Sequence, residues 1–229
     1  MLDHPDSLAP ESARLLARLA APLGEAELYL AGSAALALHL GHRRVRDLDL
    51  MSMANRLTPP ERRDLLQALL AAAPGIQVET ARDGLLSLRG AESPAATVAV
   101  RCFYYPYPLV APTLEHAGIE VASLADLGLM KLGAIISRGT RRDFVDLYLL
   151  CQRLSLADLL VLAADKFGHV GDFPLQAVKG LADTSEVEGE PMPVLERAVA
   201  WNDVERWVDE QVRTLGATHL GNAAAVEPR

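Results

Sequence analysis

Two aspartates separated by one leucine, fourteen residues after a Gly-Ser pair, constrain this chain more than any other feature. Side chains alternate between the two faces of a strand, so Asp47 and Asp49 are expected on the same side of an extended segment. Two carboxylates held that close repel each other unless a cation lies between them, and ligation by oxygen alone suits Mg²⁺. The pair therefore predicts a divalent-metal site.

The Gly-Ser pair, Gly32 and Ser33, lies between an expected strand at 27–31 and a short apolar helix at 34–40. A turn that leads into a helix offers backbone N–H groups to phosphate. Either feature alone is more often an ordinary turn or a solvated surface. The segment around the aspartates is apolar, however, and an uncompensated carboxylate pair is costly there. The combination favours a nucleoside-triphosphate site.

A second cluster of charged residues surrounds an expected helix–turn–helix. Lys131 and Arg138 are seven residues apart, which is two helical turns, and therefore share one helix face. Gly139 ends that helix, and Asp143 and Asp146 lie together on a flank of the apolar stripe of the next one. A lysine and an arginine are the residue types that neutralise the charge of a triphosphate.

Each residue of this cluster also has a structural explanation. Thr140 and Asp143 have the spacing of a helix capping box, in which Asp143 serves the backbone. Lys131 fits a solvated helix charge, and Arg142 has the spacing to pair with Asp146 one turn later. Both interpretations stay open at this point.

Hydrophobic patterns predict a mixed α/β amino-terminal half and a helical carboxyl-terminal half. Strands are expected at 27–31, 47–51, 76–80, 85–89 and 97–104, and helices at 11–23, 34–40, 62–73 and 194–215. The change in character falls at 106–122. We therefore expect an α/β core at 1–110, a helical domain at 111–216 and a flexible tail at 217–229.

Composition excludes some classes of function. The net charge of −8 excludes a chain coated in positive potential for gripping nucleic acid, although a local basic surface is compatible with it. Five arginines could form such a surface for RNA or act as counter-charges to the carboxylates: Arg43, Arg44, Arg46, Arg141 and Arg142. The absence of a signal sequence and of a long apolar span predicts a cytoplasmic protein without membrane partners. Cys102 and Cys151 lie in apolar runs and are expected to be reduced core residues.

Two stretches resemble the motifs of a known family. Residues 30–50, from Leu-Ala-Gly-Ser to Asp-Leu-Asp-Leu, resemble the first motif of AbiEii/AbiGii-type nucleotidyltransferases, and residues 131–148 are similar to the second and third motifs. The resemblance implies an α/β (α+β) fold, in which a minimal DNA-polymerase-β-like nucleotidyltransferase core with a mixed sheet precedes a helical domain. The family includes toxins of type IV toxin–antitoxin and phage-defence systems, some of which add nucleotides to tRNA.

The resemblance also implies roles for the first cluster and an activity. Gly32 and Ser33 would hold nucleotide phosphates, while Asp47 and Asp49 would bind Mg²⁺ as catalytic residues. The reaction implied is transfer of a nucleoside monophosphate from a nucleoside triphosphate to an acceptor hydroxyl, with tRNA or another RNA among the expected acceptors and an antitoxin as an expected partner.

The second cluster receives roles from the same resemblance. Lys131 would contact the triphosphate as a catalytic residue, and Asp143 would be the catalytic acid of the third motif, supported by Asp146. Arg138 would be a further phosphate contact.

One departure from the family pattern affects the metal site. The polymerase-β-like fold usually takes a third metal carboxylate from the strand expected at 97–104, which contains no acid and one charge, Arg101. Three alternatives remain for the missing carboxylate. Asp143 or another acid takes its place, or two carboxylates and the substrate are enough to bind the metal, or the site has weak catalytic activity. The departure motivates an alternative function, a catalytically inactive nucleotide- or partner-binding module on the same fold.

Overall fold

The computed structural model describes residues 2–91 and 97–224 and shows two compact units. The amino-terminal unit is Met1–Leu127 and the carboxyl-terminal unit is Gly128–Arg229. The division falls inside helix α4 (Leu124–Ser137). The strands all belong to the amino-terminal unit, whereas the described part of the carboxyl-terminal unit consists of helices and their connections.

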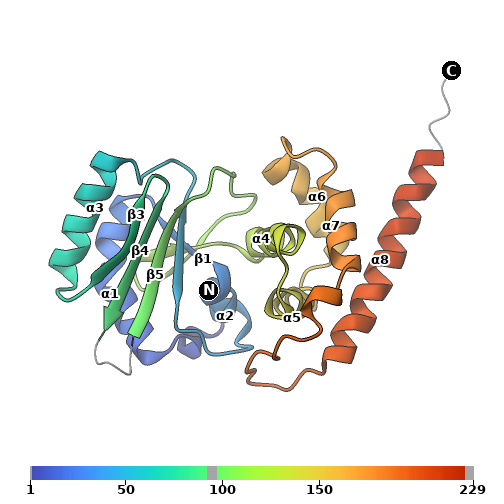
Figure 1. The fold of residues 1–229 in the computed structure, drawn as a ribbon, viewed down its shortest axis with the longest axis horizontal. Helices are drawn as coiled ribbons and strands as arrows, with labels where there is room; N and C mark the ends of the chain where they lie inside the picture. The colour runs from blue at the N-terminus through green and yellow to red at the C-terminus, as the bar shows by residue number, and fades with distance from the viewer. Residues whose placement is uncertain (1, 92–96, 225–229) are drawn as a thin grey trace. The chain divides into compact units, whose positions relative to one another are not determined.

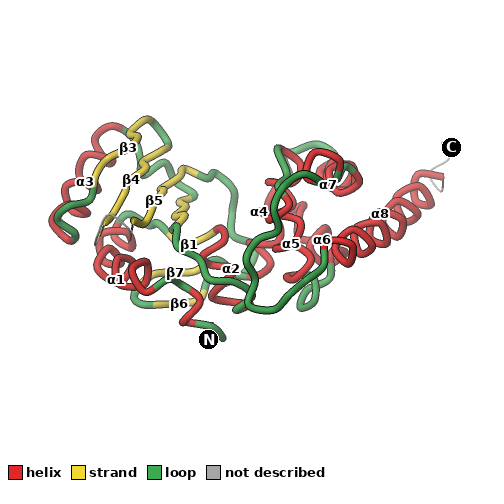
Figure 2. Tube along the Cα trace, turned by 60° about the horizontal axis from the view of Figure 1, so that its bottom comes forward, coloured by secondary structure: helices red, strands yellow, loops and turns green. Residues whose placement is uncertain are grey.

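Seven strands in the described residues form one mixed sheet in the order β3-β4-β5-β2-β1-β7-β6 (Figures 1 and 2). Their bounds are β1 (Tyr29–Ala31), β2 (Leu48–Ser52), β3 (Gln77–Arg82), β4 (Leu85–Ala91), β5 (Thr97–Tyr104), β6 (Leu114–His116) and β7 (Ile119–Val121). Strand β2 runs parallel to β5 and β1 runs parallel to β7, whereas the other neighbours are antiparallel. The predicted mixed sheet is confirmed.

Three helices of the amino-terminal unit accompany this sheet: α1 (Pro10–Glu25), α2 (Gly32–Leu40) and α3 (Pro59–Ala72), with a 3₁₀ turn at Pro5–Ser7. Helices α1 and α3 pack side by side, and α1 also contacts β5 and β7 (Figure 1). Leu15 of α1 lies against Gly90 of β4, where a Cβ would lie 2.6 Å from the leucine side chain. The face of the sheet that α1 covers therefore forms part of the apolar core.

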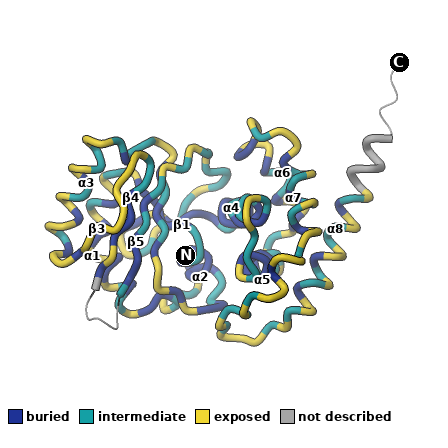
Figure 3. The backbone as a smooth tube through the Cα atoms, viewed as in Figure 1, coloured by how far each residue is buried: buried dark blue, intermediate teal, exposed yellow. Residues whose placement is uncertain are grey.

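The alternation of side chains explains why that core forms. On β2, Leu48 and Leu50 are fully buried, whereas Asp49 between them is half-buried on the other face. Figure 3 shows the same contrast between whole elements, because α2 is mostly buried whereas β3 is exposed. Cys102 of β5 is a buried free thiol, and burial together with the charge of Asp49 raises its pKa to about 12. The expectation of a reduced core cysteine is confirmed for Cys102, while Cys151 is half-buried.

The carboxyl-terminal unit contains the remaining helices: α5 (Arg141–Leu150), α6 (Leu156–Phe167), α7 (Phe173–Ala182) and α8 (Trp201–Ala224), with a 3₁₀ turn at Ser185–Val187. Edge-to-face aromatic pairs connect α5 to α8, with Phe144 against Trp201 at 6.2 Å and Tyr148 against Trp207 at 5.6 Å between ring centroids. None of the helices described has the length and apolar character that a membrane span requires.

Three sequence expectations differ from the structure. Strands β6 and β7 form a hairpin within 106–122, where no strand was expected. Helix α8 begins at Trp201 rather than at Val194, whose side chain is 90% exposed and therefore has no packing to stabilise a helical turn there. Helix α8 also continues to Ala224, past the expected end at 215, and residues 225–229 of the expected tail lie outside the described residues.

Two neighbouring leucines on α3 give a matched test of the core. Leu69 is fully buried, whereas Leu70 is 38% exposed. We expect Leu69→Ala to lower the free energy of unfolding by about 2–5 kcal/mol, because it leaves a cavity, and Leu70→Ala to lower it by less than about 1 kcal/mol. Urea unfolding followed by circular dichroism measures both. Equal losses for the two variants would contradict the burial of Leu69 and the exposure of Leu70 on α3.

Candidate functional site

The first candidate cluster begins where β1 passes directly into α2. Gly32 is the first residue of α2 and has a φ of +60°, a left-handed conformation that favours glycine. A Cβ at this position would lie 2.8 Å from Oδ2 of Asp49. The backbone at the amino end of α2, with Ser33 as its second residue, therefore closely approaches the Asp49 carboxylate.

The sheet holds the two aspartates beside this turn. Ala31 of β1 is paired with Asp49 of β2, which places the carboxylate next to the end of β1. Asp47 lies one residue before β2 begins, not inside it as expected. The alternation still holds, because both aspartates reach the same partner, Arg101.

Arg101 of β5 bridges the two carboxylates. It is paired directly with Asp49 across the parallel β2–β5 ladder. Its Nη1 donates to Asp49 Oδ1 and its Nη2 donates to Asp47 Oδ2, each at 3.2 Å. Asp47 Oδ1 also accepts a hydrogen bond from the backbone N–H of Ala99 at 3.3 Å. A cation therefore compensates the carboxylate pair, as the apolar surroundings require.

Partial burial would lower the pKa of Arg101, but the charges and hydrogen bonds of Asp49 and Asp47 raise it above its ordinary value. The guanidinium is therefore charged at every pH at which the protein is folded. Sequence reasoning noted Arg101 only as a charge on an acid-free strand and did not assign it to this cluster. The sequence feature that could have identified Arg101 is its position on the strand that pairs with the aspartate-bearing strand.

The donor set fits a divalent cation held by two protein carboxylates. In the part of the chain that the structure describes, no group of three or more His, Cys, Asp or Glu side chains could hold a metal. Asp47 and Asp49 nevertheless supply hard oxygen donors on one side of the sheet, and the Asp49 carboxylate lies directly against the Gly32 backbone. The other ligands of such an ion would be water and substrate oxygens.

The second cluster is a buried ion-pair network within the carboxyl-terminal unit. Nζ of Lys131, on α4, lies 2.8 Å from Oδ1 of Asp143 and 2.8 Å from Oδ2 of Asp146, both on α5. All three side chains are buried. The interpretation of Lys131 as a solvated helix charge is therefore wrong, and the structure brings together three of the residues singled out in the sequence.

Asp143 has a structural role as well. The capping box is present: Oδ2 of Asp143 accepts from the Thr140 N–H at 3.2 Å and from its hydroxyl at 2.7 Å, and the Thr140 Oγ1 accepts from the Asp143 N–H at 3.3 Å. One carboxylate thus caps α5 and holds the lysine.

The network keeps its residues charged. Burial alone would lower the pKa of Lys131, but the charges of Asp146 and Asp143 raise it above its ordinary value. Burial would raise the pKa of Asp143, yet the charge and hydrogen bond of Lys131 lower it. The stability that Asp143 contributes is therefore fully present above about pH 4, the usual carboxyl pKa, and is lost as pH falls through the lowered value.

Arg138 is placed elsewhere. It follows the end of α4, is exposed, and lines a cavity of about 390 Å³ to which Lys179 and Asp183 also contribute. Lys131, seven residues earlier, is buried with the two aspartates. The structure therefore does not bring these two cations to one place, although the helical spacing predicted that they share a face.

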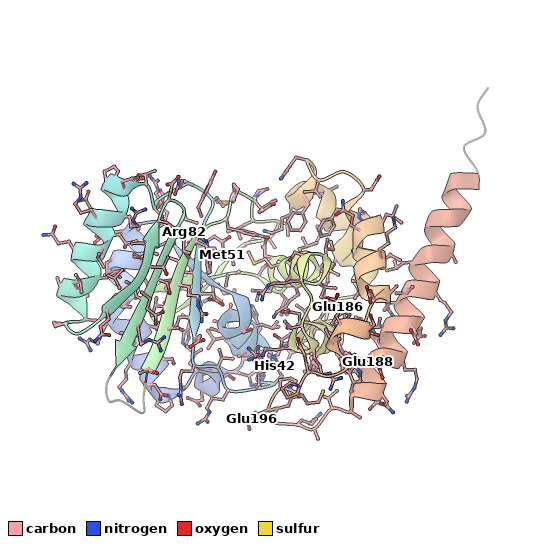
Figure 4. All side chains as sticks on the ribbon, viewed as in Figure 1. His42, Met51, Arg82, Glu186, Glu188 and Glu196 are labelled. Carbon is pink, nitrogen blue, oxygen red and sulfur yellow. The ribbon has the colours of Figure 1, made fainter. Side chains whose placement is uncertain are left out.

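The arginines of the expected basic surface also differ from one another. Arg46 pairs with Glu11 at 3.0 Å, and Arg43 is buried. The guanidinium of Arg141 lies 4.5 Å from the ring centroid of Trp201 and donates to the backbone oxygen of Glu188, which is labelled in Figure 4. Arg44 and Arg142 are exposed.

A comparison with protein families gives a match over most of the chain. Residues 14–206 match the family described as nucleotidyl transferase AbiEii toxin of type IV toxin–antitoxin systems. The chain belongs to this AbiEii family. It is therefore a nucleotidyltransferase of a toxin family, and the predicted family and class of enzyme are confirmed.

Individual relatives agree with this AbiEii assignment. The uncharacterized protein aq_aa25 of Aquifex aeolicus (strain VF5) is 26% identical over 191 residues, which are 82% of this chain and 87% of the relative. JHP933 from Helicobacter pylori has a TM-score of 0.59 at 18% identity, covering 96% of this chain and 100% of that one. MenT4, the nucleotidyltransferase toxin Rv2826c from Mycobacterium tuberculosis H37Rv, has a TM-score of 0.53 at 16% identity, covering 90% and 84%. At these identities the two solved structures show the fold, as predicted.

The buried network gives a test of stability in this AbiEii protein. We expect Lys131→Met to lower the free energy of unfolding by about 3–5 kcal/mol, because it leaves two buried carboxylates without their cation. Lys179→Met, an exposed lysine of α7, is the matched control and should change stability by less than about 0.5 kcal/mol. Urea unfolding of both variants measures the difference. A Lys131→Met protein as stable as the wild type would contradict the network.

Proposed function

We propose that this AbiEii nucleotidyltransferase depends on Mg²⁺ and transfers a nucleoside monophosphate from a nucleoside triphosphate to an acceptor hydroxyl, with tRNA or another RNA as the proposed acceptor. We further propose that it acts in the cytoplasm as the toxin of a type IV toxin–antitoxin or phage-defence system. The single observation that carries the proposal is the approach of Gly32, at the amino end of α2, to the Asp49 carboxylate.

The start of α2 supports the binding of phosphate. Its first backbone N–H groups have no partner within the helix and lie at the positive end of the helix dipole, so they favour an anion. Gly32 allows the Asp49 carboxylate to approach the backbone because it has no side chain, and Ser33 adds a hydroxyl at the same turn. We assign both residues to the β- and γ-phosphates.

Asp47 and Asp49 are the residues that would hold Mg²⁺ beside this turn. The bound ion would neutralise charge on the triphosphate as the α-phosphate is attacked. Asp143 is engaged with Lys131 and with the cap of α5, which favours the alternative in which two carboxylates and the substrate complete the metal site. Removal of divalent cations should therefore abolish transfer.

Lys131 keeps the proposed role of stabilising the pyrophosphate leaving group. Its Nζ is held charged by Asp143 and Asp146, and a fixed cation stabilises negative charge without reorganisation during the reaction. Asp143 and Asp146 are positioning residues in this proposal because they act through the lysine. Arg138 remains a proposed phosphate contact that is supported only by its charge and exposure.

Transfer itself is the first test. We expect Asp49→Asn to reduce incorporation of labelled nucleotide into total RNA by at least about 100-fold, because it removes a metal ligand and its charge. Glu120→Gln, an exposed acid of β7, is the control and should incorporate nucleotide at the wild-type rate. Each of the four labelled triphosphates is supplied in turn. Wild-type protein that binds Mg²⁺ and triphosphate in calorimetry but transfers to no acceptor would support the inactive binding module instead.

Growth provides the second test. Expression of the wild-type chain should slow the growth of a bacterial host if the enzyme consumes or modifies an essential RNA. Asp47→Ala should relieve the inhibition at equal protein levels, because the metal site is lost while Asp47 lies outside the core. Growth curves and immunoblots measure the two quantities. Equal inhibition by wild type and Asp47→Ala would contradict a toxic activity at this site.

A further inference from the structure

The position of Arg101 points to the number of metal ions that the site can take. We propose that Arg101 takes the place of a second metal ion, so that the pair Asp47 and Asp49 binds one divalent cation. This inference rests on the proposed function, because it concerns the metal of the same site. It follows from three observations within the amino-terminal unit.

The first observation is the geometry of the guanidinium. One of its terminal nitrogens donates to Asp49 and the other to Asp47, each at 3.2 Å. Two-metal sites place their ions about 3.5–4 Å apart and hold both with shared carboxylates. In this site the planar guanidinium of Arg101 hydrogen-bonds both carboxylates. A cation of fixed geometry therefore lies between them, where shared metal ions would lie in a two-metal site.

The second observation is the charge. Two carboxylates and one guanidinium carry a single net negative charge. Two divalent cations bring four positive charges to within a few ångströms of that guanidinium, and like charges repel strongly at such separations. A single divalent cation keeps this repulsion smaller than two would.

The third observation is the asymmetry of the cluster. Arg101 and the Ala99 N–H both bond Asp47, and Arg101 takes Oδ1 of Asp49. Oδ2 of Asp49 is the oxygen that approaches Gly32, where the phosphates are proposed to bind. Arg101, on β5, therefore supplies positive charge on one side of Asp49, and the proposed phosphate site lies on the β1 side.

The location of Arg101 on the sheet makes the arrangement stable. Asp49 and Arg101 form one cross-strand pair of the β2–β5 ladder, so the guanidinium is anchored directly opposite its carboxylate. The next row on the same face runs from Tyr29 of β1 through Met51, Phe103 and Leu85 to Arg82, and Figure 4 labels Met51 and Arg82. Arg82 is therefore a second arginine on this face of the sheet, on β3 rather than beside the aspartates.

The experiment counts ions with Mn²⁺ as the probe. Equilibrium dialysis with Mn²⁺ and a non-hydrolysable α,β-methylene nucleoside triphosphate, each of the four in turn, gives the number of Mn²⁺ ions per bound nucleotide. Electron paramagnetic resonance then distinguishes an isolated Mn²⁺ from two coupled neighbours. We expect one ion per nucleotide and an uncoupled spectrum for the wild type. Two ions, or a coupled spectrum, would overturn the proposal for Arg101 alone.

Two variants test whether Arg101 sets the number. Arg101→Asp replaces the cation by a third carboxylate, and we expect it to bind two Mn²⁺ ions per nucleotide with a coupled spectrum. Arg82→Asp makes the same change of charge on the same sheet face and should keep one ion. A folded Arg101→Asp protein that still binds one ion, or an Arg82→Asp protein that binds two, would contradict the role of Arg101.

The remaining outcomes are also decisive. If Arg101→Asp fails to fold by circular dichroism, Arg101→Ala removes the cation without adding an acid. It should bind Mn²⁺ alone at least about threefold more tightly than the wild type, because an opposing charge is gone; unchanged or weaker binding would overturn the proposal. Wild-type protein that binds neither Mn²⁺ nor nucleotide would contradict the proposed function itself, a result distinct from two ions bound with nucleotide.

Discussion

The approach of Gly32 to the Asp49 carboxylate is the constraint on which the amino-terminal unit depends. It requires a left-handed glycine at the first turn of α2, a short β1 that ends one residue earlier, and a β2 whose buried leucines fix which face the aspartate takes. A side chain at Gly32 would displace the carboxylate, and a one-residue slip of β2 would bury Asp49 in the core. Fold and site are thus determined by the same few contacts.

The two charged clusters show two ways of keeping carboxylates near one another. Asp47 and Asp49 share a partly buried arginine at the edge of the proposed metal site. Asp143 and Asp146 share a buried lysine, and one of them also caps a helix. A buried network of this kind is costly to break at any point, which favours a single fixed geometry for the lysine.

Local patterns predicted most of this structure, and long-range pairing accounts for what they missed. Alternation alone placed Asp47 and Asp49 on one side, and the spacing of Thr140 and Asp143 predicted the cap of α5. No local pattern relates Asp49 to Arg101, because the two are 52 residues apart and meet only through the β2–β5 ladder. The β6–β7 hairpin had a signal in its alternating short strands around a two-residue turn, but three-residue strands are too short to stand out.

The two tryptophans of the chain both lie on α8, where each ring packs against an aromatic residue of α5. Tryptophan fluorescence therefore reports on the helical carboxyl-terminal unit and does not report on the sheet, which contains no tryptophan. Comparing the loss of that emission with the loss of β-sheet signal during denaturation would reveal whether the two units melt together or as separate cooperative blocks. The positions of the two tryptophans therefore provide a fluorescence signal for the unfolding of the carboxyl-terminal unit.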